Sequence, residues 1–184
     1  MTLALAAAAF LLAGPPRFLG PPEKKPAEGE PAPLGPGDPA PVFFAPMQNG
    51  AAGQKQFNLA ELVGRRVAGR SPVKAVLLGF FCRKSRASRK ELSVLQTLYT
   101  QYKSQGLEVA SLATDPAALL TTRAVTYPVV QDPKGAIARR YLGPNPLYPA
   151  AVIIARDGTI TALKKGYRGD PAVLLRTEVE SALR

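Results

Sequence analysis

The stretch that decides the fold is residues 73–113, VKAVLLGFFCRKSRASRKELSVLQTLYTQYKSQGLEVASLA. Residues 73–81 are almost continuously apolar, which is typical of a strand buried on both faces of a sheet. Residues 91–103 carry apolar side chains every three or four positions, which predicts an amphipathic helix ending before Gly106. Residues 107–113 predict a second buried strand. Together these elements predict a right-handed parallel crossover.

The start of this helix carries a capping signal. Ser88 is followed three residues later by Glu91, as in a capping box. In that motif the serine oxygen accepts a backbone N–H and the carboxylate reaches back to the cap. The sequence therefore predicts that Ser88 begins the helix.

Elements on either side complete an α/β pattern. Upstream, residues 42–44 predict an edge strand and residues 57–62 a second amphipathic piece. Downstream, residues 150–164 predict an antiparallel hairpin that turns at residues 156–159. The remaining predicted elements are a short helix after Pro116, a strand at 127–132, a helix at 133–141 and a last helix that Asp170 caps.

Composition excludes several chemistries. The 184 residues include no His and one Cys, so His-dependent catalysis, nearly every zinc site and an intramolecular disulfide are excluded. The net charge is +11, and it lies in the chain beyond the first 41 residues. Such a charge favours anionic partners, or it only keeps the protein soluble. Because the cations are scattered and no run of stacking aromatics accompanies them, nucleic acid is not an expected partner.

The N-terminal 41 residues differ from the rest. Residues 1–14 contain TLALAAAAFLLA, which is too short to span a membrane and is typical of a signal peptide. Residues 15–41 are rich in proline and predict a disordered, extended tether. We therefore expect a periplasmic or secreted protein with one folded domain at residues 42–184. It would touch the membrane only through an uncleaved N-terminus.

Several segments match one family in order and spacing. They are GDPAPVF from Gly37, FNLAELVGR from Phe57, VLLGFF from Val76, SRKELSVLQTLY from Ser88, TYPVVQDPKGAIARRYLG from Thr126 and YPAAVIIARDGTI from Tyr148. The chain resembles the exported thioredoxin-like proteins of TlpA and ResA type and, more distantly, the AhpC/TSA-related peroxiredoxins. The resemblance implies an α/β thioredoxin-like fold, in which helices flank a central mixed sheet. It also implies thiol–disulfide chemistry at a Trp-Cys-x-x-Cys motif after the first central strand.

This chain departs from the family at that motif. In the register without gaps, Ser85 and Ser88 occupy the two cysteine positions, and serine neither ionises at neutral pH nor forms a disulfide. Helix capping is the structural role left to them. A second register, which needs compensating gaps, makes Cys82 and Ser85 a monothiol Cys-x-x-Ser motif. Cys82 is then the one candidate catalytic residue, with a small core hydrophobe as the alternative, and the peroxiredoxin Pro-x-x-x-Thr-x-x-Cys pattern does not occur.

The resemblance also implies a binding site. In the family a cis-proline precedes the third central strand, and the backbone of its neighbour pairs with an extended substrate. Tyr148 and Pro149 occupy that place, although a turn needed only by the fold would look the same. Cations at a helix start are unfavourable unless they and the first-turn amides hold an anion. The cations at this helix start are Arg83, Lys84, Arg86, Arg89 and Lys90.

Two main functions remain open. An exported thioredoxin-like protein without its dithiol can act as a non-catalytic module that binds another exported protein or an extended peptide through Tyr148, Pro149, Arg86 and Arg89. Alternatively, Cys82 alone supports a thiol oxidoreductase or a peroxidase. Binding of a small anion is a third possibility. None of these functions needs a cofactor or a metal ion.

Overall fold

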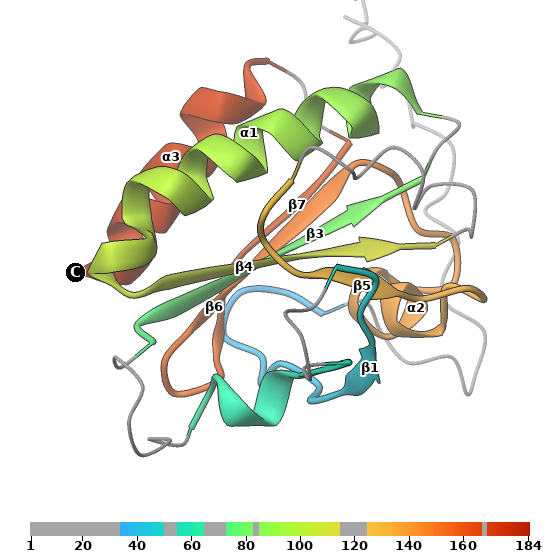
Figure 1. The fold of residues 1–184 in the computed structure, drawn as a ribbon, viewed down its shortest axis with the longest axis horizontal. Helices are drawn as coiled ribbons and strands as arrows, with labels where there is room; N and C mark the ends of the chain where they lie inside the picture. Colours follow the sequence, from blue (N-terminus) through green and yellow to red (C-terminus); the bar gives the residue numbers. More distant parts are fainter. Residues whose placement is uncertain (1–33, 50–54, 65–72, 83–84, 115–124, 167–168) are drawn as a thin grey trace, which may run out of the picture.

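The computed structural model describes residues 34–49, 55–64, 73–82, 85–114, 125–166 and 169–184. Its centre is a five-stranded sheet in the order β5-β4-β3-β6-β7 (Figure 1). Its strands are β3 (Ala75–Phe81), β4 (Leu107–Ala113), β5 (Val129–Gln131), β6 (Ala150–Ala155) and β7 (Ile160–Lys165). β3 runs parallel to β4 and antiparallel to β6, so the sheet is mixed, as predicted.

Helices cover both faces of this sheet. The helices are α1 (Arg86–Tyr102), α2 (Ala136–Leu142) and α3 (Pro171–Leu183), with short 3-10 helices η1 (Leu59–Glu61) and η2 (Lys103–Gln105). α1 and α3 pack side by side on one face, whereas α2 and η1 lie on the other (Figure 1). The second face also carries a small antiparallel pair, β1 (Phe44–Pro46) and β2 (Gln56–Asn58). None of the helices in the described ranges combines the length and the apolarity that crossing a membrane requires.

β3 is buried along its whole length, as its apolar run predicts. Its side chains alternate between two cores: Leu77 packs under α1 and α3, and Leu78 packs on the opposite face with α2 and the N-terminal segment. Gly79 lets α1 come close to the sheet, because a Cβ at this position would overlap Cδ1 of Leu95. The absence of a side chain in the middle of β3 therefore helps to set the height of α1 above the sheet.

Backbone pairing of the domain begins before residue 42. The N–H of Gly37 donates to the carbonyl of Ile160 at 2.8 Å, and the N–H of Ala40 donates to the carbonyl of Gly158 at 2.8 Å. The last part of the proline-rich segment therefore lies along the β6–β7 hairpin. The edge strand predicted at residues 42–44 is displaced to β1, because β2 supplies its pairing partner only from Phe44 onward. Residues 1–33 and the predicted short helix after Pro116 lie outside the described residues.

Candidate functional site

The Tyr148–Pro149 corner lies at the end of the sheet where β3 leads into α1. Phe80 pairs with Ala150, so Pro149 stands beside the end of β3. The peptide bond between Tyr148 and Pro149 is cis, as the resemblance implies. Cys82 follows β3 directly, two residues beyond Phe80. The structure thus brings together Cys82, Ser85 and the corner, which the sequence had singled out separately.

The start of α1 differs from the prediction. Ser85, whose backbone is extended, is the N-cap, and its Oγ accepts the N–H of Ser88 at 3.1 Å. The predicted capping box at Ser88 and Glu91 is therefore wrong. Ser88 lies inside the first turn with no exposed surface, and its Oγ has no hydrogen-bond partner among the described residues. The N-cap lies three positions earlier than predicted, because burial of that first turn outweighs the local capping motif.

Glu91 is a buried acid that the sequence did not identify. Its side chain is only 1% exposed, and its charge reaches Tyr127, which is also buried. Burial, assisted by Glu91, raises the pKa of Tyr127, whereas a hydrogen bond from Ser111 at 3.0 Å opposes the rise. The helical spacing of Glu91 with Leu92 and Leu95 gave no sign that this carboxylate faces inward.

Tyr148 stands between β4 and α2. Burial raises the pKa of its phenol, and a hydrogen bond with Thr114, just past the end of β4, partly lowers it. The phenol oxygen lies 3.9 Å from the position that a Cβ on Gly135 would take, and Nη1 of Arg139 lies 3.5 Å from the same point. Arg139 is therefore a neighbour of Tyr148. The sequence analysis missed both Thr114 and Arg139, since only the fold brings them to the corner.

Asp132 holds the α2 side of the site in place. Its carboxylate is 3% exposed and accepts the N–H groups of Ile137 at 3.2 Å and Ala138 at 2.8 Å. The Asp-Pro pair in the sequence could have marked it as a helix-starting residue. Because the N-terminus of α2 engages this carboxylate, Asp132 is a structural residue of the site.

The predicted reactive and basic residues have different surroundings. Cys82 is partly buried, so it is neither a fully packed core residue nor a fully open thiol.

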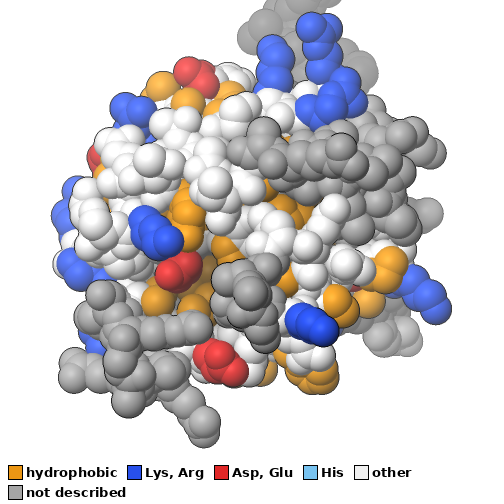
Figure 2. All heavy atoms as spheres, in the orientation of Figure 1, with side chains coloured by type: hydrophobic (Ala, Val, Ile, Leu, Met, Phe, Trp, Pro, Cys, Tyr) orange, Lys and Arg blue, Asp and Glu red, His pale blue; other side chains and the backbone are white. Residues whose placement is uncertain are grey.

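Arg86 and Arg89 are exposed on the first turns of α1, whereas Arg83 and Lys84 lie outside the described residues. On the face shown in Figure 2, Lys and Arg side chains lie both around the outline and within the face, and acidic side chains are few. In the described part of the chain, no group of three or more His, Cys, Asp or Glu side chains could hold a metal ion.

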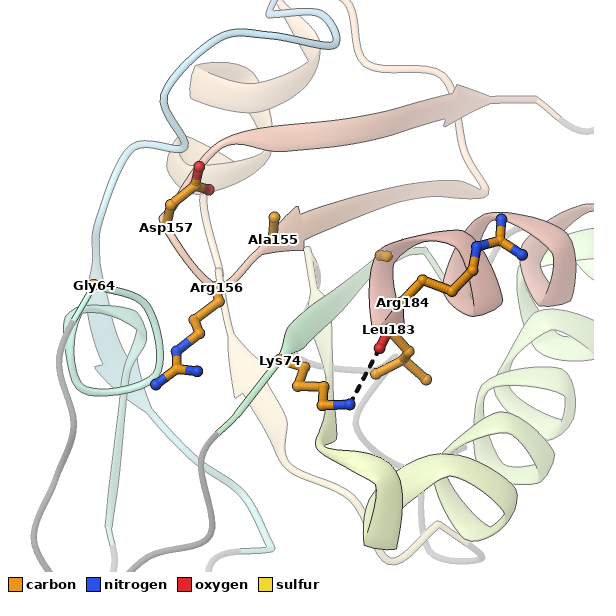
Figure 3. A pocket seen from close by; sticks show the side chains of 8 residues that line it. Gly64, Lys74, Ala155, Arg156, Asp157, Leu183 and Arg184 are labelled. Carbon is orange, nitrogen blue, oxygen red and sulfur yellow. Dashed lines mark hydrogen bonds between the residues drawn. The ribbon is translucent and has the colours of Figure 1, made fainter.

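A groove of about 720 Å³ lies at the opposite end of β3 (Figure 3). It is lined by Gly64, by Lys74, by the end of β6 and by the end of α3. The amine of Lys74 donates to the carbonyl of Leu183 at 3.3 Å and so ties α3 to the start of β3. In Figure 3 the Asp157 carboxylate points away from Lys74, and none of the predicted site residues lines this groove.

The mixed sheet, the flanking helices and the cis-proline corner define a thioredoxin-like protein, and solved structures share this fold. A thiol:disulfide interchange protein of the thioredoxin family from Chlorobium tepidum superposes with a TM-score of 0.61 at 22% identity, over 83% of this chain and all of its own. A secreted disulfide oxidoreductase of Mycobacterium tuberculosis, homologous to DsbE of E. coli, gives 0.59 at 22% identity, over 76% of this chain and 95% of its own. The fold predicted from the sequence is confirmed.

Sequence comparison gives the family. Residues 36–163 match the AhpC/TSA family, and the chain belongs to it. The thiol-disulfide oxidoreductase ResA of Oceanobacillus iheyensis is 26% identical over 136 residues, which are 71% of this chain. The match covers 65% of that relative, just under two thirds of its length. The chain is thus a TlpA/ResA-type thioredoxin-like protein, related to thiol-disulfide oxidoreductases but with a single cysteine.

Proposed function

We propose that this protein is a non-catalytic binding module, which takes an extended peptide or a segment of another exported protein at the Tyr148–Pro149 corner. The observation that carries the proposal is that the hydroxyl of Ser85 serves as the N-cap of α1. In the register without gaps Ser85 takes the place of the family's first cysteine, and its Oγ caps α1 at 3.1 Å from the N atom of Ser88. Serine carries a hydroxyl in place of a thiol, so Ser85 can form neither a thiolate nor a disulfide.

The corner keeps what strand addition needs. Among the described residues, neither the N–H nor the carbonyl of Tyr148 pairs with another backbone group, whereas the carbonyl of Pro149 accepts the N–H of Gly166 at 2.9 Å. Leu147, which precedes Tyr148, is 63% exposed and offers apolar surface. An unpaired backbone beside exposed side chains is what a protein uses to bind a peptide as an added strand.

The export of the protein is part of the proposal. The N-terminal run resembles a signal peptide, and a solved neighbour of the same fold is described as secreted. We infer that the partner is met outside the cytoplasm, where the tether would leave the domain free to reach it.

Two measurements test this function. The wild type should not reduce insulin disulfides, whereas the variant with Ser85→Cys and Ser88→Cys should gain some turnover. In NMR titrations, extended peptides should shift the amide signals of Tyr148 and Ala150. Wild-type turnover, or peptide-induced shifts confined to the groove beside Lys74, would overturn the proposal.

Cys82 favours a second candidate, a thiol oxidoreductase or peroxidase that works with one cysteine. Its side chain is partly exposed, and Cys82 follows β3 at the end of the sheet that carries the Tyr148–Pro149 corner. Any peroxide or disulfide turnover by the wild type should then disappear in Cys82→Ser. Turnover that persists in that variant would exclude Cys82 as its source.

A further inference from the structure

We propose that the peptide taken at the Tyr148–Pro149 corner is acidic; this inference rests on the proposed binding function and adds the chemistry of the partner. The evidence is a set of three exposed cations that we call the basic rim. The basic rim consists of Arg86 on α1, Lys134 beside α2 and Arg139 on α2.

One side of the basic rim is the start of α1. Arg86 follows Ser85, whose N–H donates to the carbonyl of Cys82 at 3.2 Å. Phe80, two residues before Cys82, pairs with Ala150, two residues after Tyr148. The first turn of α1 therefore lies at the same end of the sheet as the corner, and Arg86 borders the path of a peptide that pairs with Tyr148.

The other side is formed by the segment that leads into α2. Nη1 of Arg139 and the phenol oxygen of Tyr148 lie within 4 Å of the same point above Gly135. The guanidinium also donates to the carbonyl of Lys134 at 2.7 Å, which fixes it next to the Lys134 backbone. The corner thus has a cation-bearing element on each side.

In the described part of the chain, two acids near the corner are buried and add no exposed negative charge. Asp132 is 3% exposed and its carboxylate binds the N-terminus of α2, and Glu91 is 1% exposed beneath α1. Both carboxylates face inward. A peptide lying between α1 and α2 would meet exposed positive charge on both sides, which favours Asp and Glu in that peptide.

Three peptides of one length and one apolar pattern test the inference. They carry Asp, Asn or Lys at the same alternate positions and are titrated against the whole protein by fluorescence anisotropy. An exposed ion pair contributes little by itself, but several such pairs act together here. We therefore expect the Asp peptide to bind about tenfold tighter than the Asn peptide. This advantage should shrink between about 0.05 M and about 0.5 M salt. The Lys peptide should bind weakest.

Equal affinity of the Asp and Asn peptides at low salt would overturn the acidic preference and leave the binding function intact. Failure of all three peptides to bind would overturn both.

Charge reversal locates the effect. Arg86→Glu with Arg139→Glu should remove the preference for the Asp peptide, whereas Arg86→Lys with Arg139→Lys should keep it. Arg156→Glu with Arg176→Glu is the matched control, because it changes the net charge equally at exposed positions away from the corner, Arg156 in the far groove and Arg176 on α3. An equal loss in this control would mean that the overall charge acts, and the basic rim would lose its assigned role. Circular dichroism melting curves check that each variant is folded.

Discussion

The contact between Gly79 and α1 gives a prediction whose size follows from the structure. Gly79→Ala adds one methyl group in the middle of β3, where it would overlap Cδ1 of Leu95 and lie 3.6 Å from Oγ of Ser111. Leu95 is 1% exposed, so its side chain cannot move out into solvent and has to shift within the core. Overpacking of this kind costs about 1–3 kcal/mol, and the lower entropy of an unfolded chain with Ala returns about 0.5–1 kcal/mol. We expect a net loss of about 1 kcal/mol in the free energy of unfolding, within the range of about 0–2.5 kcal/mol that these two effects allow.

A double-mutant cycle tests whether Leu95 is the group responsible. Leu95→Ala alone should cost about 2–5 kcal/mol, because it leaves a cavity in the core. In the double variant the new methyl group fills part of that cavity, so the total loss should be at least about 1 kcal/mol smaller than the sum of the two single losses.

Urea unfolding followed by circular dichroism measures each variant, with the m-value checked for constancy. Leu98→Ala combined with Gly79→Ala is the control, because Leu98 belongs to the same core but is not among the atoms nearest to Gly79. This control pair should be additive within about 0.5 kcal/mol. Additive losses for Gly79 and Leu95 as well, or a stabilising Gly79→Ala, would refute the idea that the bare backbone of β3 sets the height of α1.

Three further predictions concern the helix start, the edge of the sheet and pH. Ser85→Ala should cost about 1 kcal/mol in urea unfolding while Ser85→Asp keeps the cap, and equal losses in both would show that the cap is unimportant. Asn49→Ala should cost about 1–3 kcal/mol in thermal unfolding, because Asn49 donates to the carbonyl of Tyr127 at 2.8 Å and accepts the N–H of Val129 at 2.7 Å. Burial raises the pKa values of Tyr127 and Tyr141, so folding favours their protonated forms and stability should fall as pH rises above about 10, the ordinary pKa of Tyr. Tyr141→Phe should flatten this fall in urea midpoints measured up to pH values of about 11, and an unchanged slope would contradict the assignment.

Buried strands were the part of the fold that the sequence predicted best. β4 and β6 begin and end at the predicted residues, because an apolar run flanked by Gly or Pro admits few other arrangements. The start of α1 could not be predicted in the same way. Ser85 and Ser88 both carry capping potential, and only the packing of the first turn against the sheet decides between them.

Only part of the candidate site could be located from the sequence, because some of its residues carry no local sequence signal. Motif matching located Ser85 and the Tyr148–Pro149 corner, which are close to recognisable patterns in the sequence. Thr114 and Arg139 come from separate elements and carry no local signal. They meet at Tyr148 only because β4 lies next to β3 and α2 folds back over the sheet, which depends on long-range contacts.

The two outer strands of the sheet have a consequence for how this protein behaves at high concentration. Residues 37–40 pair with the start of β7, and the N–H of Gln48 donates to the carbonyl of Val129 in β5 at 2.8 Å. Exposed strand edges recruit other chains and lead to aggregation, and proteins resist this by covering the edges or by placing lysines on them. Here N-terminal chain covers part of each edge, and β7 ends in Lys164 and Lys165. Removing residues up to 41 would therefore speed up aggregation of the domain, because it would uncover the edge of β7.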